Sequence, residues 1–532
     1  MSKMKSLSIS ISTAALMAAS PAFAEITAAE LWSLWQQQSA DYGQTLTAQV
    51  TDTGSGLVLT NLASTFGDAE VSISTLIEQV TLTDQPDGTV TIGASDTLTY
   101  RISGIDDPDA PEEISIVFRQ AGFSATASGN PEVLTLDSAM QILELEDISF
   151  SGIDPAEIPD FDATLSLTGF AGTYIYDYSD PGLLAISGSA TTGGFNMAFQ
   201  AAEMADGSAG GNAGGNGGGF TPVQPQPQPT TPSKQSPEGG SIDVALIMGA
   251  SESTFSGVLP TGIDWTDLET FPAGAAVQLD STYTSLSARV AFQDQSESFD
   301  FAAENTGGNF GFAISERGLR YELGAQGVAF NLASSEMPFP VAAAADSTLV
   351  RLDVPLARED QPSPFSAAIA YQGVTVDDGL WAMVDPGGQV PRGPATIVMD
   401  VSGTVQIFVD LLTMDPDELD NMTTPPGELR ELTLNNLQVS FGGAELTGVG
   451  DVDFTPGQII PVPVGSVDLS LTGANGLIQT LSNAGLLPPE QAGMARGMLG
   501  MFGIPGSAPD SYTSSILFGA DGSVSANGVP LR

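Results

Sequence analysis

The chain has 532 residues, no cysteine and no histidine, and its 14 basic and 64 acidic residues give a formal net charge of −50. The missing side chains exclude disulfides, histidine acid–base catalysis and the usual ligands of zinc, haem and iron–sulfur sites. The negative charge repels a phosphate backbone, so we expect no nucleic-acid binding.

The first 24 residues predict export. Lys3 and Lys5 precede a run of small and apolar residues that ends in Ala22-Phe23-Ala24. This is the pattern of a cleavable signal peptide over residues 1–24. We therefore expect cleavage after Ala24 and a periplasmic location. The later apolar runs are far shorter than the ~20 residues of a membrane-spanning helix, so we expect no transmembrane helix in the mature chain.

Residues 27–43 are predicted to form a short N-terminal helix. Thr27 and Glu30 have the spacing of a capping box, and apolar residues recur on one helix face. Trp32 and Trp35 lie close together here. We interpret them as large side chains that dock the helix onto a sheet, rather than as a ligand platform.

After Gly43 the pattern changes to an alternation of period two, interrupted by frequent turn residues. The clearest segments are 298–302, 310–314, 319–323 and 328–332. Short alternating runs with regular turns are typical of antiparallel meanders with one apolar face. We therefore predict a mainly β protein with long, curled antiparallel sheet, the short N-terminal helix and a small helical insert near the C-terminus.

Residues 206–240 interrupt the alternation. Glycine fills eight of the thirteen positions from Gly207 to Gly219, and several prolines follow. The composition predicts a disordered linker or loop. It separates an N-terminal β-rich half, residues 25–205, from a C-terminal β-rich half, residues 241–532. The segment either joins two domains or connects neighbouring strands of one sheet, and we favour the loop because both flanks have strand patterns.

The helical insert is predicted near residues 475–503. One helix begins near Gly476 and a second begins at Pro488-Pro489. The second carries a methionine-rich apolar face (Met494, Met498, Leu499, Met501 and Phe502). Such a face is either an adaptable surface for lipid or a partner, or part of the core, and we favour the core.

Three acidic clusters provide oxygen ligands of the type that calcium prefers: residues 106–113, 154–162 and 415–420. None has the spacing of an EF-hand or of a nonapeptide calcium repeat. No pattern selects a nucleophile, a base or a pair of catalytic acids. We therefore assign no catalytic, cofactor-binding or metal-binding residue, and no cofactor.

The sequence of about the last 200 residues resembles an alphaproteobacterial family of uncharacterised exported proteins, known as domain of unknown function 2125. The resemblance rests on these segments: Met337-Pro338-Phe339-Pro340, Trp381-Ala382-Met383-Val384-Asp385-Pro386, Pro425-Pro426-Gly427-Glu428-Leu429, Gly443-Ala444-Glu445-Leu446-Thr447-Gly448 and Met498-Leu499-Gly500-Met501-Phe502. The resemblance to this family implies no particular biochemical activity. The layout is also similar in architecture to AsmA-like envelope proteins, whose curled sheets are linked to lipid handling.

Our leading expectation is a non-enzymatic envelope protein with a curled sheet. On this sheet it binds either a hydrophobic ligand such as lipid or a protein partner such as another envelope protein. One alternative is a carboxylate-dependent hydrolase of envelope glycan, which needs two acids about 5–9.5 Å apart. Another is an outer-membrane β-barrel, whose strands alternate in the same way.

Overall fold

The computed structural model describes residues 25–67, 72–104, 113–153, 158, 160–202, 240–261, 263, 270–457 and 461–531. The predicted signal peptide lies outside these residues, and so does the predicted linker except for Gly240. Most of the first acidic cluster and residues 154–157 and 159 of the second also lie outside them.

The described chain contains five helices and 28 strands. The helices are α1 (Ala28–Asp41), α2 (Asp378–Val384), α3 (Pro416–Asp420), α4 (Ala474–Asn483) and α5 (Pro489–Phe502). The strands of the first half are β1 (Thr45–Asp52), β2 (Gly56–Gly67), β3 (Ser72–Asp84), β4 (Val90–Ala94), β5 (Thr97–Ser103), β6 (Glu113–Ala121), β7 (Ser124–Gly129), β8 (Val133–Ser151), β9 (Asp160–Asp177), β10 (Leu183–Thr192) and β11 (Gly194–Ala202).

The remaining strands follow residue 240. They are β12 (Ser241–Met248), β13 (Ser251–Pro260), β14 (Ala276–Tyr283), β15 (Leu286–Gln293), β16 (Ser298–Asn305), β17 (Gly308–Ser315), β18 (Gly318–Ser334), β19 (Val341–Pro355), β20 (Ser363–Val376), β21 (Ala395–Ile407), β22 (Gly427–Phe441), β23 (Ala444–Phe454), β24 (Pro463–Thr472), β25 (Ile504–Pro505), β26 (Ser511–Phe518), β27 (Val524–Ala526) and β28 (Val529–Pro530).

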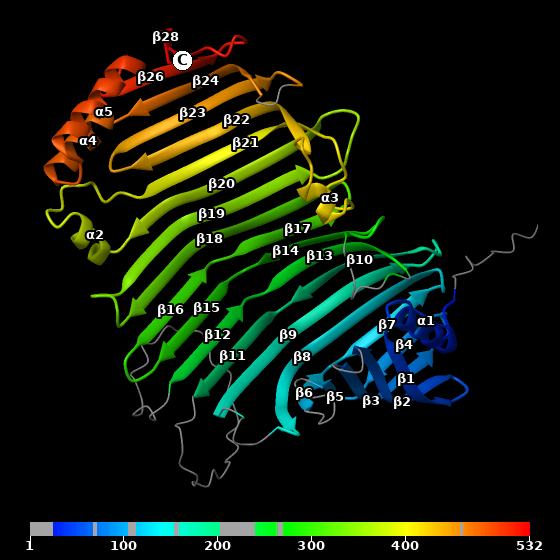
Figure 1. Cartoon of the computed structure of the whole chain (residues 1–532). Coiled ribbons are helices and arrows are strands. Elements are labelled where there is room, and N and C mark those ends of the chain that lie inside the picture. The colour runs from blue at the N-terminus through cyan, green and yellow to red at the C-terminus, as the bar shows by residue number, and fades with distance from the viewer. Residues whose placement is uncertain are drawn as a thin grey trace, which may run out of the picture.

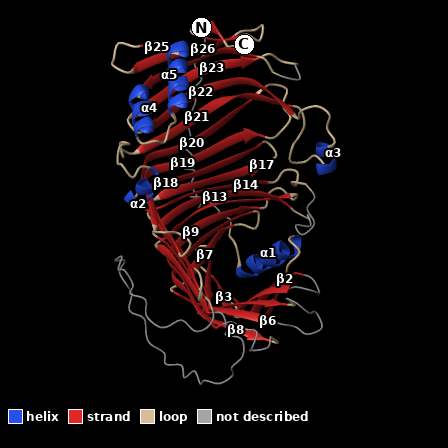
Figure 2. Cartoon of the chain, turned by 60° about the vertical axis from the view of Figure 1, so that its left-hand side comes forward, coloured by secondary structure: helices blue, strands red, loops and turns tan. Residues whose placement is uncertain are grey.

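All 28 strands belong to one antiparallel sheet, in which most strands pair with their neighbours in sequence. The sheet forms a long curled band, with α1 at the end formed by β1–β4 and with α4 and α5 at the end formed by β22–β26 (Figure 1). Figure 2 shows the same band from another side, with the helices at its margins. The prediction of a mainly β, antiparallel and curled fold with a short N-terminal helix is confirmed.

In the middle of the sheet, pairs of short strands continue each other in line. The first part of the long strand β9 pairs with β11, and its last part pairs with β10. The pairs β12/β13, β14/β15 and β16/β17 follow in the same way, and both members of the last pair meet the long strand β18. The breaks between the short strands lie side by side, so they form a line across the sheet.

We name this line the crease. It runs through Asn61, Gly122, Gly169, Gly193, Gly249, Gly307, Gly327 and Gly373, where the pairing skips a residue or passes from one short strand to the next. Several of these residues have the left-handed backbone that favours glycine, with φ of 60° at Gly169 and 56° at Gly327. One residue on each paired strand is left out of the pairing there, as at Gly169 and Gly327, and this shifts the alternation by one position. The same side of the sheet therefore stays apolar on both sides of the crease.

The strands that flank residues 203–239 are direct neighbours. Strand β11 pairs with β12 from Phe195 opposite Met248 to Ala202 opposite Ser241. The two predicted halves therefore contribute strands to one sheet, which is the arrangement that the loop interpretation expects.

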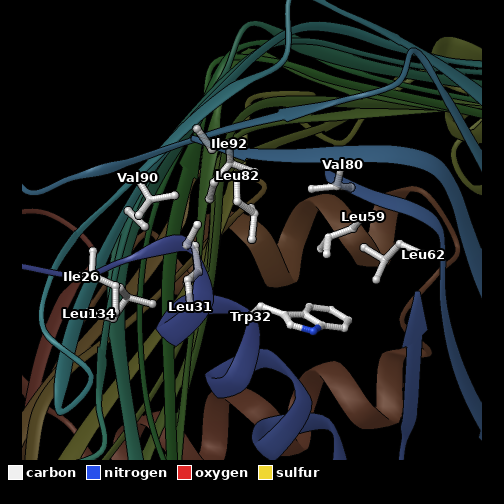
Figure 3. Packing of buried hydrophobic residues seen from close by; sticks show 13 residues of the cluster. Ile26, Leu31, Trp32, Leu59, Leu62, Val80, Leu82, Val90, Ile92 and Leu134 are labelled. Carbon is white, nitrogen blue, oxygen red and sulfur yellow. The ribbon is translucent and has the colours of Figure 1, made fainter. Parts of the chain in front are cut away.

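Helix α1 covers the N-terminal end of the sheet. Thr27 and Glu30 form the predicted capping box. Leu31 and Trp32 pack among Leu59, Leu82 and residues of β4, β7 and β8 (Figure 3). Leu31, Leu59 and Val90 have 0% exposure, so this end of the sheet has a dry two-layer core. The predicted docking role of Trp32 and Trp35 is confirmed, since Trp35 also packs against this cluster.

Candidate functional site

One side of the sheet, which we name the apolar face, carries rows of apolar side chains that cross many strands. Residues paired in register on antiparallel strands point to the same side. One such row consists of Ala163, Phe199, Val244, Val290, Phe301, Leu332 and Val341. On the other side of the crease, a second row consists of Tyr174, Gly188, Phe255, Leu279, Phe312, Tyr321, Leu352, Ala367 and Val401.

The opposite side, the polar face, carries the charges. Its row next to Phe199 consists of Asp162, Gln200, Asp243, Ala291, Asp300 and Ala333. Arginines of this face pair with carboxylates across strands. Arg289 binds both carboxylate oxygens of Asp300, at 3.1 and 2.7 Å, and Arg351 lies 3.2 Å from Asp400.

No charged residue occupies a register position of the apolar face from β5 to β24. The register places the acids and arginines that have a strand partner on the polar face, as Asp280 and Glu322 illustrate beside Phe312 and Tyr321. A chain with 64 acidic residues therefore keeps this side of the sheet free of charge from β5 to β24, whereas Asp52 and Asp84 stand on it at the N-terminal end. Apolar residues such as Ile247 and Val449 also occur on the polar face, so it is the absence of charge that distinguishes the apolar face.

The apolar face is open over most of its length. Phe292, Phe299 and Leu323 keep 37%, 40% and 43% of their surface exposed although they point to the same side as the buried Leu59. Beyond α1, α4 and α5, the described helices cover the face only at its margin, where Trp381 of α2 stacks on Phe441 of β22. A typical soluble monomer exposes apolar patches of about 300–600 Å². From β5 to β24 the face crosses fifteen strand positions spaced about 4.8 Å apart, so it is far larger than that.

Both sides of the crease belong to this same face. Leu59 and Leu62 stand on either side of Asn61 in β2, and both pack in the cluster under α1. Tyr176 of β9 also packs against this cluster. Its burial, with a smaller contribution from Tyr174, raises the pKa of Tyr176 and keeps the phenol neutral. The N-terminal end of the apolar face is thus closed by a helix, and Asp84, which stands opposite Val90 there, accepts a hydrogen bond from the Ala28 N–H at the start of that helix.

The C-terminal end of the face is covered differently. Helices α4 and α5 stand over β23, β24 and β26 and leave a cavity of about 530 Å³. The sheet contributes Leu446, Leu469, Leu471, Tyr512, Ile516 and Ala526 to its wall. The helices contribute Leu477, Ile478, Ala495, Met498, Leu499 and Phe502. We name this cavity the C-terminal pocket.

The methionine-rich face of α5 is not core, so that expectation was wrong. Met494, Met498 and Met501 are 65%, 50% and 59% exposed. Met498 lines the pocket, whereas Met494 and Met501 lie outside its lining. The prediction of two helices in this region is confirmed by α4 and α5.

Asp510 fixes the start of α4. Its carboxylate accepts hydrogen bonds from the backbone N–H groups of Asn475 and Gly476, at 3.1 and 3.0 Å. Desolvation acts to raise the pKa of Asp510, but these hydrogen bonds outweigh it and hold the pKa below its usual value. Since Gly473 offers no side chain at the N-cap, Asp510 supplies the missing cap from a distant loop.

The acidic clusters do not converge into a site where the structure describes them. Glu113 pairs with Arg101 at 3.8 Å, and Asp160 and Asp162 lie in β9. Asp415 accepts a hydrogen bond from the N–H of Asp417 and caps α3. Among the described residues, no three carboxylates are placed to hold a metal ion.

No described helix has both the length and the apolarity that crossing a bilayer requires.

Fold and site together define a curled, single-sheet β protein with one face that is free of charge from β5 to β24 and that is covered by helices at both ends. The last part of the chain, residues 272–531, matches the model of a family described as an uncharacterized protein conserved in bacteria, DUF2125. This part of the chain belongs to that family, as its sequence motifs predicted. It includes the strands from β14 onward, α4, α5 and the C-terminal pocket. Searches of curated proteins and of solved structures found no match.

Proposed function

We propose that this protein is an exported, non-enzymatic envelope protein that holds the acyl chains of lipids on its apolar face. The observation that carries the proposal is the continuous uncharged face from β5 to β24, exposed in a chain of net charge −50. The signal-peptide pattern of residues 1–24 supports export, and the likeness in layout to AsmA-like proteins supports a role in lipid handling.

The dimensions of the face suit acyl chains. Strand β18 has 17 residues, so at roughly 3.3 Å per residue it extends over about 56 Å. Each side of the crease thus offers more length than one acyl chain, since one leaflet of a bilayer's hydrocarbon core is about 15 Å thick.

The chemistry of the face favours lipid over a protein partner. A protein interface carries about one hydrogen bond per 100–200 Å² and a polar rim. The rows of the apolar face offer phenylalanine, leucine and valine, with tyrosine and small residues between them. Contacts of this kind do not discriminate between partners by hydrogen bonding, but they solvate hydrocarbon well.

The first test is native mass spectrometry of the purified protein, before and after solvent extraction. We expect adducts of lipid mass that extraction removes and that return after incubation with phosphatidylethanolamine vesicles. The double variant Phe199→Asp with Phe301→Asp puts two charges on the apolar face. Burying an unpaired carboxylate under hydrocarbon costs several kcal/mol, so we expect the adducts to fall by roughly tenfold or more.

The matched control is Gln200→Asp with Ala302→Asp. It adds the same two charges to the same two strands on the polar face, where Ala302 lies opposite Arg289. The control should keep the adducts of the wild type. Wild-type protein without adducts after incubation, or equal loss in both double variants, would contradict the proposal.

A further inference from the structure

The two ends of the apolar face are covered by helices that pack in opposite ways. Under α1 the side chains of helix and sheet interlock, and Leu31 and Val90 are fully buried. Under α4 and α5 the described residues leave the cavity of about 530 Å³, and only Ala474 and Ala492 of the two helices are buried. This pocket is open to solvent on one side, since Met498 in its lining is 50% exposed, whereas the interior under α1 is close-packed. A cavity of this size lies instead within the range of ligand sites, about 300–1,000 Å³.

The pocket is built as a compartment of the apolar face itself. Leu446, Leu471 and Tyr512 stand in one register row, which continues from Ile397 and Val439 of the preceding strands. On α5, Ala495, Met498, Leu499 and Phe502 recur at helical spacing and face this row. A hydrocarbon chain lying along the face can therefore continue beneath α5 without meeting a charged side chain.

The polar groups around the pocket indicate where a ligand headgroup belongs. The Tyr512 hydroxyl is engaged, because it accepts a hydrogen bond from Asn475 at 2.7 Å. Between residues 461 and 531, Arg496 is the only basic residue of the sequence and four residues are acidic. None of the described residues that line the pocket is charged, so the lining offers no counter-charge for an ionised headgroup and suits the apolar part of an amphiphile.

Helix α5 has the composition of a cover that can move. Gly493, Gly497 and Gly500 have no neighbouring atom within 4 Å of an added Cβ, so packing does not require glycine at these positions. Glycine in a helix interior lowers helix stability. The flexible methionine side chains adapt to ligands of different shape.

From these observations we infer that the C-terminal pocket binds the end of a single acyl chain, with α5 as its movable cover, while α1 permanently closes the other end of the face. This inference rests on the proposed function and deepens it, because it names the pocket as the site where one chain end is held. The occupant is the hydrocarbon chain of a lipid with an uncharged or zwitterionic headgroup.

The test uses oxidation of methionine in the full mature protein, with monopalmitoylglycerol as the probe. Hydrogen peroxide oxidises exposed methionine, and peptide mass spectrometry reports each residue separately. Met498 lines the pocket, while Met494 and Met501 on the same helix serve as internal controls. We expect the probe to slow oxidation of Met498 severalfold and to leave Met494 and Met501 within twofold. Equal protection of all three residues, or no protection of Met498, would overturn the inference.

A pair of variants separates the pocket from the rest of the face. Ala495→Phe fills the pocket from its helical wall, whereas Met494→Phe adds an aromatic ring on the same helix outside the lining. Both are checked for folding by circular dichroism and thermal unfolding. We expect Ala495→Phe to abolish the protection of Met498 and Met494→Phe to preserve it.

The outcomes also distinguish this inference from the proposed function. If Ala495→Phe folds and the probe still protects Met498, the pocket inference fails. The proposed function would still hold in that case, provided that Phe199→Asp with Phe301→Asp reduces the lipid adducts. If Met498 alone is protected in the wild type and Ala495→Phe removes that protection, the pocket inference holds, even where the face variants leave the adducts unchanged.

Discussion

The ring of Phe161 on β9 stacks on the ring of Phe199 on β11, with centroids 6.0 Å apart and ring planes inclined by 26°. In register Phe199 lies opposite Ala163, so the two rings meet diagonally across the strands. Phe150 of β8 adds an edge-on contact to Phe161 at 5.7 Å. Over the open part of the sheet such cross-strand contacts replace the second layer that a sandwich would provide, while the rings stay partly exposed.

The dry core under α1 should carry much of the stability of the N-terminal end. Leu31 has 0% exposure, so we expect Leu31→Ala to lower the free energy of unfolding by about 2–5 kcal/mol through lost burial and the cavity that it leaves. Gln37→Ala, on the exposed side of α1, should stay within about 0.5 kcal/mol. Urea unfolding followed by tryptophan fluorescence measures both. Equal effects of the two changes would contradict the structure of this core.

The crease requires left-handed backbone at Gly169, where φ is 60°. We expect Gly169→Ala to cost about 1–2 kcal/mol, because a Cβ disfavours this conformation. Gly169→Asn should cost less, since asparagine tolerates the left-handed region better than alanine does. Both substitutions place a Cβ at the same distance, 3.2 Å, from the Gly193 nitrogen, so the comparison isolates the backbone conformation. Thermal unfolding would refute the prediction if alanine were tolerated better than asparagine.

The cap that Asp510 provides for α4 predicts a pH dependence. Hydrogen bonds hold its folded pKa below the unfolded value of about 3.9, so its contribution is complete above that value and is lost as the pH falls through the folded pKa. Asp510→Asn should lower stability near neutral pH by about 1 kcal/mol, the usual size of a lost cap. The difference in the free energy of unfolding between wild type and variant should narrow below about pH 4. Unfolding curves between pH 3 and 7 measure this difference. A difference in stability that stays constant with pH would contradict the role of the carboxylate.

The exposed glycines of α5 predict a stabilising change. Gly497→Ala should raise the stability of this helix by about 0.5–1 kcal/mol, because no neighbouring atom obstructs the new methyl group. Hydrogen exchange of the α5 amides measures the effect directly. Gly503→Ala is the contrasting variant, since its Cβ would lie 2.7 Å from the Leu499 carbonyl oxygen and should destabilise the end of the helix. Faster exchange in Gly497→Ala than in the wild type would be the contrary result.

Local patterns were sufficient to predict the strands and the three longer helices, but not the exposure of their side chains. The Thr27 and Glu30 spacing located α1, and the alternation around Phe301 and Phe330 predicted strands with one apolar side. Alternation reports which residues share a face, but not whether a second layer covers that face. For this reason the methionines of α5 were assigned to a core that the structure does not contain.

The crease and the short helices left weaker signals in the sequence. A glycine within a strand pattern, such as Gly169, indicates a local break in the strand, but the alignment of many breaks into one line depends on strand register. Asp377 and Asp415 cap α2 and α3 with recognisable N-cap residues, yet helices of 7 and 5 residues carry too little periodicity to predict. The cap from Asp510 to α4 joins residues 34 or more positions apart, beyond the reach of local patterns.

The pairing of each strand with only its nearest neighbours has a consequence for how this architecture can change in size. Such a sheet is organised almost in one dimension, so its stability is close to a sum of neighbour contributions. One added hairpin would lengthen the apolar face by about 9–10 Å, two strand spacings, without repacking distant strands. Insertion or loss of whole hairpins between α1 and α4 would therefore adjust the capacity of the face in regular steps while both ends stay intact.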